Sequence, residues 1–396
     1  MERKVTFHEI WVTLRRKLST NDRGNELNLL YTTVFGPNGV LMKNLHRQSS
    51  TDGYFPSGHN GPYGHQETPV RNTAHWVVSL STMLRHSSEP RLNDALSAAV
   101  EYLLSEKHRP GGYTFHCRDA PGRDKTNGVI GQAWVMEALI HASRTIARPE
   151  LLDLALQLYF MHPWNPRAAA WEVRELWGET GRLDTTFNHQ LWFASISSML
   201  GDDEVDRHVE AFISTHVDKL QTYRDGVIYH LGGQFPAASS SKYSTRLVPA
   251  VNLFRHVARR SLKRKFRLKS SAYHAFNLMA LLNLSSNMPF LDYWKSANFA
   301  SLLRPLTSQN FAAEISESPY GFEYNLAGYE SAIVAYKFGL SNANVKYWQK
   351  AQEAVTPLSR DFGLSTGDRW TCLARLYELS YLNLNPPAVH FLSNRT

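Results

Sequence analysis

Cysteine is scarce in this sequence of 396 residues, which contains only Cys117 and Cys372. Two cysteines cannot build a disulfide framework, and they cannot form a zinc site made of thiolates. No run of about 18 apolar residues occurs, so the sequence predicts no membrane-spanning helix. The first residues, MERKVTFHEIWVTLRRKLS, lack the apolar core of a secretory signal. We therefore expect a cytoplasmic protein without a membrane partner, or a secreted one if an export signal precedes this sequence.

Basic residues outnumber acidic residues, although charged residues make up only 20% of the chain. There are 43 basic and 35 acidic residues, and the formal net charge is +8. A basic protein tends to bind an anionic partner such as nucleic acid, a membrane surface or an acidic polysaccharide. The basic run at 255–269 comes with no helix-turn-helix, RRM or zinc signature, so we expect no nucleic-acid partner. An anionic polysaccharide or oligosaccharide fits the high aromatic content of 12%, although aromatic rings also fill cores.

Two classes of helix alternate along the chain. One class begins with polar or aromatic residues and then turns apolar on all sides; its members begin near Thr68, Asn127, Phe187, Ser271, Leu326 and Asp368. The other class is amphipathic and covers 6–18, 92–107, 150–161, 203–220, 290–303 and 343–355. Helices that are apolar on all sides are buried, whereas amphipathic helices face water on one side.

This alternation predicts an all-α fold, an (α/α)6-type toroid of helix hairpins that forms one domain over 1–396. An open solenoid of helix pairs would share the pattern, but no strict repeated motif supports it. Two segments, 52–69 and 230–246, are too long for simple connections. Long loops of this kind often form lids or the walls of a cleft.

In a toroid, the N-terminal ends of the inner helices meet at one end of the ring. Polar residues near these ends are therefore expected to line one cavity, with a Trp and a loop glutamate beside them. The residues that we expect to bind substrate are Arg71, Asn72, His75, Asn127, Gln132, Trp192, Arg246, His274, Glu323 and Tyr329. For Glu323 the alternative is a surface loop packed by its own Tyr and Phe side chains, and for Asn188 and His189, at the start of one inner helix, it is helix capping or core packing.

Two segments carry a family resemblance. FNHQLWFA, at 187–194, resembles the Asn-His-x-x-Trp motif of alginate-lyase-type toroid polysaccharide lyases. AYHAFNLMALL, at 272–282, resembles their later Tyr-His helix, which carries the catalytic tyrosine. The resemblance implies that Asn188 neutralises a substrate carboxylate, that His189 acts as base or assists it, and that Tyr273 is the acid, alone or together with the role of base.

The resemblance also implies the reaction, which is β-elimination of a uronic-acid-containing glycan. Binding the carboxylate lets it carry the charge that develops when the C5 proton is removed, and no metal or cofactor is required. The family's arginine, about two turns before the tyrosine, is missing here because residue 266 is Phe. Arg267, Lys269, Arg71 and Arg246 are the possible substitutes.

A second resemblance involves GHNGPYGHQETPVRNTAHW and NGVIGQAWVMEAL, at 58–76 and 127–139. Both are similar to AglQ-like proteins encoded in archaeal and bacterial glycan-assembly clusters, which are related to six-hairpin glycosidases and unsaturated-glucuronyl-hydrolase-like toroids. This resemblance implies a sugar substrate more than a particular reaction.

The prediction is thus a polysaccharide lyase that acts on an alginate- or glucuronan-like substrate. A uronate C5-epimerase would use the same proton abstraction. A glycoside hydrolase would instead use two carboxylates, and the acidic residues near inner-helix ends are Asp52, Glu67, Asp184, Glu323 and Glu330. A non-catalytic scaffold with a basic face is the last alternative. The spacing of His59, His65 and His75 matches no usual metal motif, and the oligomeric state stays open.

Overall fold

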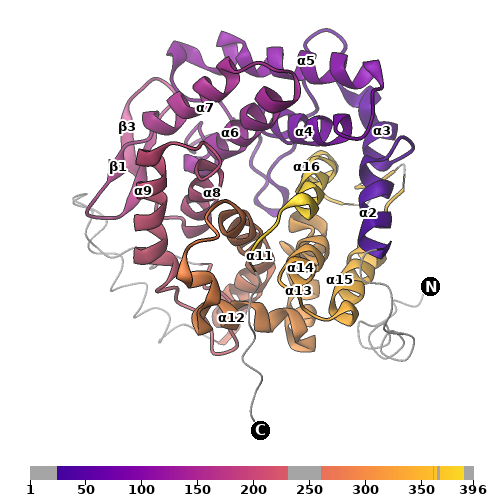
Figure 1. Ribbon diagram of the computed structural model, residues 1–396, viewed down its shortest axis with the longest axis vertical. Helices are drawn as coiled ribbons and strands as arrows, with labels where there is room; N and C mark the ends of the chain where they lie inside the picture. The colour runs from indigo at the N-terminus through magenta and orange to yellow at the C-terminus, as the bar shows by residue number, and fades with distance from the viewer. Residues whose placement is uncertain (1–24, 231–259, 360, 364–365, 388–396) are drawn as a thin grey trace.

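The computed structural model describes residues 25–230, 260–359, 361–363 and 366–387, and in it the chain forms a ring of helices (Figure 1). The inner helices are α4 (Pro69–Leu84), α6 (Gly128–Thr145), α8 (Phe187–Ser197), α11 (Arg260–Asn287), α14 (Ala327–Lys337) and α16 (Arg369–Ala374) with η9 (Arg375–Asn383). The outer helices are α2 (Asn25–Phe35), α5 (Pro90–Leu104), α7 (Glu150–Met161), α9 (Asp203–Phe212), α12 (Ala297–Leu303) and α15 (Asn342–Val355). The predicted all-α toroid is confirmed.

Shorter helices connect the two layers. They are α3 (Val40–Asn44), α13 (Gln309–Glu317), η1 (Leu45–Arg47), η2 (Gly61–Tyr63), η3 (Glu106–His108), η4 (Pro110–Gly112), η5 (Ile213–Val217), η6 (Asp292–Lys295), η7 (Arg304–Thr307) and η8 (Gly321–Asn325). No helix within the described ranges is long and apolar enough to cross a membrane.

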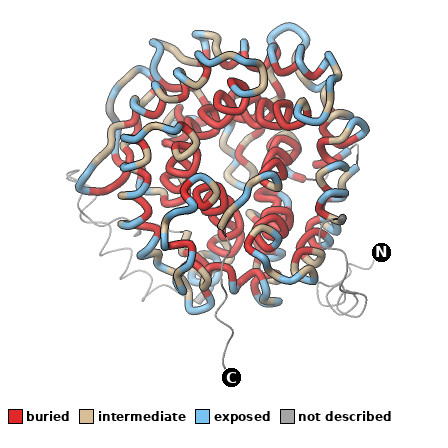
Figure 2. The backbone as a smooth tube through the Cα atoms, viewed as in Figure 1, coloured by how far each residue is buried: buried red, intermediate tan, exposed pale blue. Residues whose placement is uncertain are grey.

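Burial separates the two helix classes as the sequence predicted (Figure 2). Every residue of inner helix α6 is buried except the last two, whereas outer helix α7 buries only Leu151, Ala155, Leu158 and Tyr159. These four lie on one face at helical spacing, which is the pattern of a helix with one side in water. The inner ring is therefore a core in which every polar side chain needs a partner.

Helix α2 closes the ring within the described part of the chain. The helix expected at 6–18 lies outside the described residues. The Tyr31 hydroxyl of α2 accepts a hydrogen bond of 3.2 Å from Asn383 Nδ2, and Glu26 forms an ion pair of 2.7 Å with Lys346 of α15. The two ends of the described chain thus meet through side chains that are far apart in sequence.

A small antiparallel sheet, which the sequence did not predict, precedes α8. Its strands are β1 (Trp164–Asn165), β2 (Ala170–Arg174) and β3 (Thr180–Leu183), in the order β1-β2-β3. Gln190 of α8 holds it in place, because its Oε1 accepts from the backbone N–H of Trp171 and its Nε2 donates to the Trp171 carbonyl. The sheet is a three-stranded antiparallel meander attached to the N-terminal end of an inner helix.

At four inner helices, including α8, a helix side chain forms such a hydrogen bond with the backbone of a preceding segment. Gln132 of α6 bonds both backbone groups of Phe115, Thr73 of α4 accepts from Phe55 N–H, and His274 of α11 accepts from Ile228 N–H. We call Thr73, Gln132, Gln190 and His274 the clamp residues. Each one satisfies backbone groups in the segment that leads into its helix, so the loops at this end of the ring are fixed to the core.

Candidate active site

A cavity of about 370 Å³ opens at the end of the ring where the inner helices begin. All six inner helices, or the residues directly before them, contribute to its lining. Its size suits one or two sugar rings. The convergence that the sequence predicted is therefore present.

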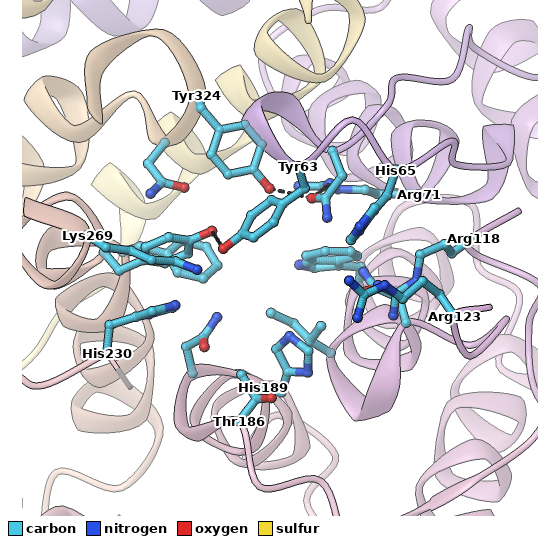
Figure 3. A pocket seen from close by; sticks show the side chains of 18 of the residues that line it. Tyr63, His65, Arg71, Arg118, Arg123, Thr186, His189, His230, Lys269 and Tyr324 are labelled. Carbon is cyan, nitrogen blue, oxygen red and sulfur yellow. Dashed lines mark hydrogen bonds between the residues drawn. The ribbon is translucent and has the colours of Figure 1, made fainter. Parts of the chain in front are cut away.

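The chemistry of the lining is one-sided. Within the described part of the chain, the lining contains Arg, Lys, His, Tyr, Asn, Thr and apolar side chains, but no Asp or Glu. Figure 3 shows His189 and Thr186 at one edge, Tyr63 and Tyr324 facing them, Lys269 and His230 on the left, and Arg118 and Arg123 on the right. Such a cavity favours an anionic ligand.

His189 is the cavity residue with the clearest catalytic arrangement. Its Nδ1 lies 2.9 Å from Oδ2 of Asp184, and its side chain is 21% exposed while that of Asp184 is 8% exposed. Burial alone would raise the pKa of Asp184, but His189 and the N–H groups of Thr186 and Val129 outweigh burial and hold that pKa below its usual value. An ionised Asp184 accepts a hydrogen bond from an Nδ1–H of the imidazole, and in that tautomer Nε2 is able to accept a proton.

Gly128 makes room for this pair. It begins α6 with a left-handed φ of 61°, and a Cβ there would lie 2.1 Å from Asp184 Oδ2 and 2.8 Å from His189 Nδ1. A side chain at this position would displace the carboxylate or the imidazole. Asn127, directly before it, also has a left-handed φ, of 60°, and lines the cavity.

A tyrosine wall faces the His189 edge. The hydroxyls of Tyr63 and Tyr273 lie 2.9 Å apart, and the Tyr324 hydroxyl donates to Asn60 Oδ1 at 2.5 Å. Burial, together with Tyr324 and Tyr63, raises the pKa of Tyr273 well above its usual value. Tyr273 therefore stays protonated near neutral pH and can donate a proton.

Lys269 lies one helical turn before Tyr273, among aromatic rings. Its Nζ lies 4.7 Å from the ring centroid of Tyr63 and 4.9 Å from that of Tyr320, and no described carboxylate is within ion-pair distance. Burial lowers the pKa of Lys269 to about 8. His230 stacks on Tyr273 at 4.0 Å, and burial, then Lys269 and His189, lower its pKa well below the usual value.

Two buried arginines that line the cavity are already paired. Arg71 donates to Glu67 at 2.8 Å and to Asn60 Oδ1 at 3.2 Å. Arg375 lies 2.6 Å from Glu330 and 2.7 Å from Glu378. Because their charges are balanced by neighbours, neither arginine is a free anion receptor.

Of the thirteen predicted site residues, five line the cavity: Arg71, Asn127, Asn188, His189 and Tyr273. The structure brings the three predicted catalytic residues together, and their catalytic roles stay predictions. Arg246 lies outside the described residues.

The other seven predicted residues do not line the cavity, so that expectation is corrected. Gln132 and His274 are clamp residues, and Asn72 donates to the Pro56 carbonyl. Three rings are packed in the core: His75 stacks on Tyr377 at 4.2 Å, Trp192 stacks on Phe276 at 4.7 Å, and Tyr329 is buried. Glu323 is exposed and points elsewhere than into the cavity.

The candidate arginines and carboxylates are also engaged elsewhere. Arg267 pairs with Asp225 and Glu314 rather than facing the cavity. Of the acidic residues near inner-helix ends, Glu67, Asp184 and Glu330 pair with Arg71, His189 and Arg375, and Asp52 and Glu323 lie outside the lining. Among the described residues, no group of three His, Cys, Asp or Glu side chains could hold a metal ion.

Sequence reasoning missed several lining residues. Tyr63 and His65 come from the loop at 52–69, which had been expected to form a wall, but their individual roles carried no signal. Lys269 was named only as a substitute for the missing arginine. Arg118 and Arg123 follow no motif, and only the ring brings them into the cavity. His230 is the first residue of the expected cleft segment 230–246, and the rest of that segment lies outside the described residues.

Comparison with solved structures defines the class. The cellobiose 2-epimerase from Spirochaeta thermophila superposes with a TM-score of 0.59 at 12% identity, over 94% of this chain and 97% of the other. A sugar epimerase from a ruminal bacterium gives a TM-score of 0.58 at 11% identity, over 90% and 98%. At this identity the likeness concerns the fold alone, and it places the chain among the (α/α) toroid proteins.

Sequence comparison then gives the family. Archaeal glycosylation protein Q from Haloferax volcanii is 32% identical over 346 residues, which cover 84% of this chain and 93% of that protein. The chain belongs to the family of archaeal glycosylation protein Q, as the second resemblance predicted. No protein-family model matches the chain.

Proposed function

We propose that this protein is an enzyme that removes the C5 proton of a uronic acid within a glycan and returns a proton to the opposite face, which makes it a uronate C5-epimerase. The observation that carries the proposal is a cationic cavity without a lining carboxylate, in which the His189–Asp184 pair faces the Tyr63–Tyr273 pair. A role in modifying a glycan also agrees with the name of the relative from Haloferax volcanii.

The absence of a lining carboxylate among the described residues argues against hydrolysis. A glycosidase of the usual kind needs two carboxyl groups beside the scissile bond. To remove a proton from a carbon next to a carboxylate, an enzyme needs a base of moderate strength. It also needs positive groups that stabilise the negative charge that develops on the carboxylate. His189 supplies the base, and Lys269 and the Asn188 amide are the groups that contact the substrate carboxylate.

In the first step, Nε2 of His189 takes the C5 proton. The electrons of the broken C5–H bond move into the carboxylate, which becomes an enediolate held by Lys269. In the second step, the Tyr273 hydroxyl gives its proton to C5 from the other face, and a C5–H bond of inverted configuration forms. His189 then releases its proton to solvent and the tyrosine pair takes one up, so no atom is gained or lost overall.

Incubation in deuterated water tests the proposal directly. We expect uronate-containing oligosaccharides to gain deuterium at C5 and to accumulate the C5 epimer, measured by NMR and mass spectrometry. Products that gain the mass of water without C5 exchange would instead indicate hydrolysis and contradict the proposal.

β-Elimination is the second candidate, because the raised pKa of Tyr273 suits a general acid that protonates a leaving O4. His189 would again take the C5 proton, but Tyr273 would give its proton to the leaving oxygen rather than to C5. Elimination is recognised in the same experiment by a shorter glycan with a conjugated, ultraviolet-absorbing end.

A further inference from the structure

Three cationic or basic side chains form a separate wall of the cavity, across from Lys269 (Figure 3). We call Arg118, Arg123 and His65 the basic wall. Arg118 is ion-paired with Asp124 at 2.9 Å, and its Nε donates to the Asp124 carbonyl. Arg123 is exposed, and no carboxylate of the described ranges lies within ion-pair distance of it. One guanidinium of the wall thus lacks a counter-ion.

The backbone that carries the basic wall is fixed. Asp119 N–H donates to the Gln66 carbonyl at 2.8 Å, which joins the loop of His65 to the loop of the two arginines. Arg118 N–H donates to the Lys125 carbonyl at 3.0 Å and closes the second loop on itself. The three side chains therefore start from positions that are set before any ligand arrives, which reduces the entropy lost on binding.

Placing these groups together has a cost. Burial, then Arg123 and Arg118, lower the pKa of His65, and its Nδ1 is buried without a hydrogen-bond partner among the described residues. Like charges and unsatisfied polar atoms are unfavourable unless a ligand compensates them. An oxyanion does so, because it can accept hydrogen bonds from the unpaired guanidinium of Arg123 and from a neutral imidazole N–H of His65, while Arg118, which is paired with Asp124, adds positive charge to the wall.

We infer that the basic wall is a second oxyanion subsite and that the natural substrate carries two negative groups. The inference rests on the proposed function for the first group, the uronate carboxylate at Lys269. The second group is a carboxylate or phosphate on the adjoining part of the glycan. In Figure 3, Lys269 and the basic wall lie on opposite sides of the cavity, and we therefore assign them to two different negative groups of the ligand.

Binding of three defined ligands tests the inference by calorimetry. Glucuronate carries one negative group, a disaccharide of two glucuronates carries two carboxylates, and glucuronate 1-phosphate carries a carboxylate and a phosphate. We expect at least one doubly anionic ligand to bind about tenfold or more tightly than glucuronate, the scale of a charge-assisted hydrogen bond. Which of the two shows the gain identifies the second group.

Two variants test whether the basic wall causes the tighter binding of doubly anionic ligands. Arg123→Gln is expected to abolish the tighter binding while leaving glucuronate binding unchanged. Lys125→Gln is the matched control, because it makes the same charge change in the same loop, but Lys125 is paired with Asp119 at 2.8 Å and does not line the cavity. Equal affinity for all three ligands, no measurable binding of either doubly anionic ligand, or an equal loss in both variants would overturn the inference.

Deuterium exchange at C5, measured on the same samples, separates this inference from the proposed function. If C5 exchange occurs but doubly anionic ligands bind no more tightly than glucuronate, the second subsite is rejected and the proposed reaction is kept. If doubly anionic ligands bind more tightly and Arg123→Gln abolishes this difference, but no C5 exchange occurs, the second subsite is kept and the proposed reaction is rejected.

Discussion

Neighbouring residues at the mouths of the inner helices have opposite roles. His189 and Tyr273 face the cavity, while the next residues, Gln190 and His274, turn away and clamp backbone. Successive side chains on a helix point about 100° apart. When one residue faces the cavity, the next residue therefore faces the loop behind the helix. A polar residue in a buried helix needs a partner, and at these mouths the partner is either a loop or a substrate.

The largest effect is expected from His189. His189→Asn removes the base but keeps a polar side chain beside Asp184, and turnover should fall about 10² to 10⁴-fold, the usual contribution of a general base. Thermal unfolding should change little, since the side chain is partly exposed. Near-normal C5 exchange in this variant would exclude His189 as the base.

Tyr273→Phe should lower turnover about 10²-fold or more, because it removes a proton donor while keeping the ring. The free energy of unfolding should fall by only about 1 kcal/mol, the value of one hydrogen bond, here with Tyr63. If epimer formation is lost but C5 exchange persists, Tyr273 acts in the second step alone. Unchanged epimer formation would contradict its role as acid.

Lys269 should affect both substrate binding and turnover, because in the proposed reaction it contacts the substrate carboxylate and then holds the enediolate. Lys269→Met is expected to raise KM about tenfold for a uronate substrate, the scale of one charge-assisted hydrogen bond. Since the pKa of Lys269 is lowered to about 8, the wild-type protein should lose this charge, and KM should rise, as pH increases through about 8. Lys269→Arg stays charged, so its KM should not rise there; a parallel rise in both proteins would assign the titration to another group.

The smallest effect on turnover is expected from a clamp residue. His274→Ala leaves Ile228 N–H and the Leu302 carbonyl without their side-chain partner, and the free energy of unfolding should fall by about 1 to 3 kcal/mol. Activity per folded molecule should stay close to that of the wild type. A large loss of turnover without destabilisation would show that the clamp and cavity residues do not divide as proposed.

Much of the ring could be predicted because helix burial leaves a periodic pattern. All-round apolar character identified the inner helices, and one apolar face identified the outer ones. The small sheet was missed, since strands of two to five residues leave too short a pattern. The sequence predicts that this helix begins near Ser271, whereas α11 begins at Arg260, because its first turns are basic and project beyond the core.

The site could be predicted only in part. Asn188, His189 and Tyr273 were found because they stand in short motifs on helices of known direction. Gln132 and His274 were misassigned because the sequence shows that a residue is polar but not which way its side chain points. The sequence does not distinguish Asp184, the partner of His189, from the other acidic residues near the inner-helix ends.

The sequence by itself determined the alternation of buried and amphipathic helices, and thereby a ring whose inner helix ends meet. Local composition is enough for this, because each helix records its own surroundings in its own residues. Only the tertiary structure decided what faces the cavity: Tyr63 meets Tyr273 across 210 positions, and Lys269 stands opposite Arg118 and Arg123. Contacts between distant segments depend on how the whole ring packs, and no single segment encodes them.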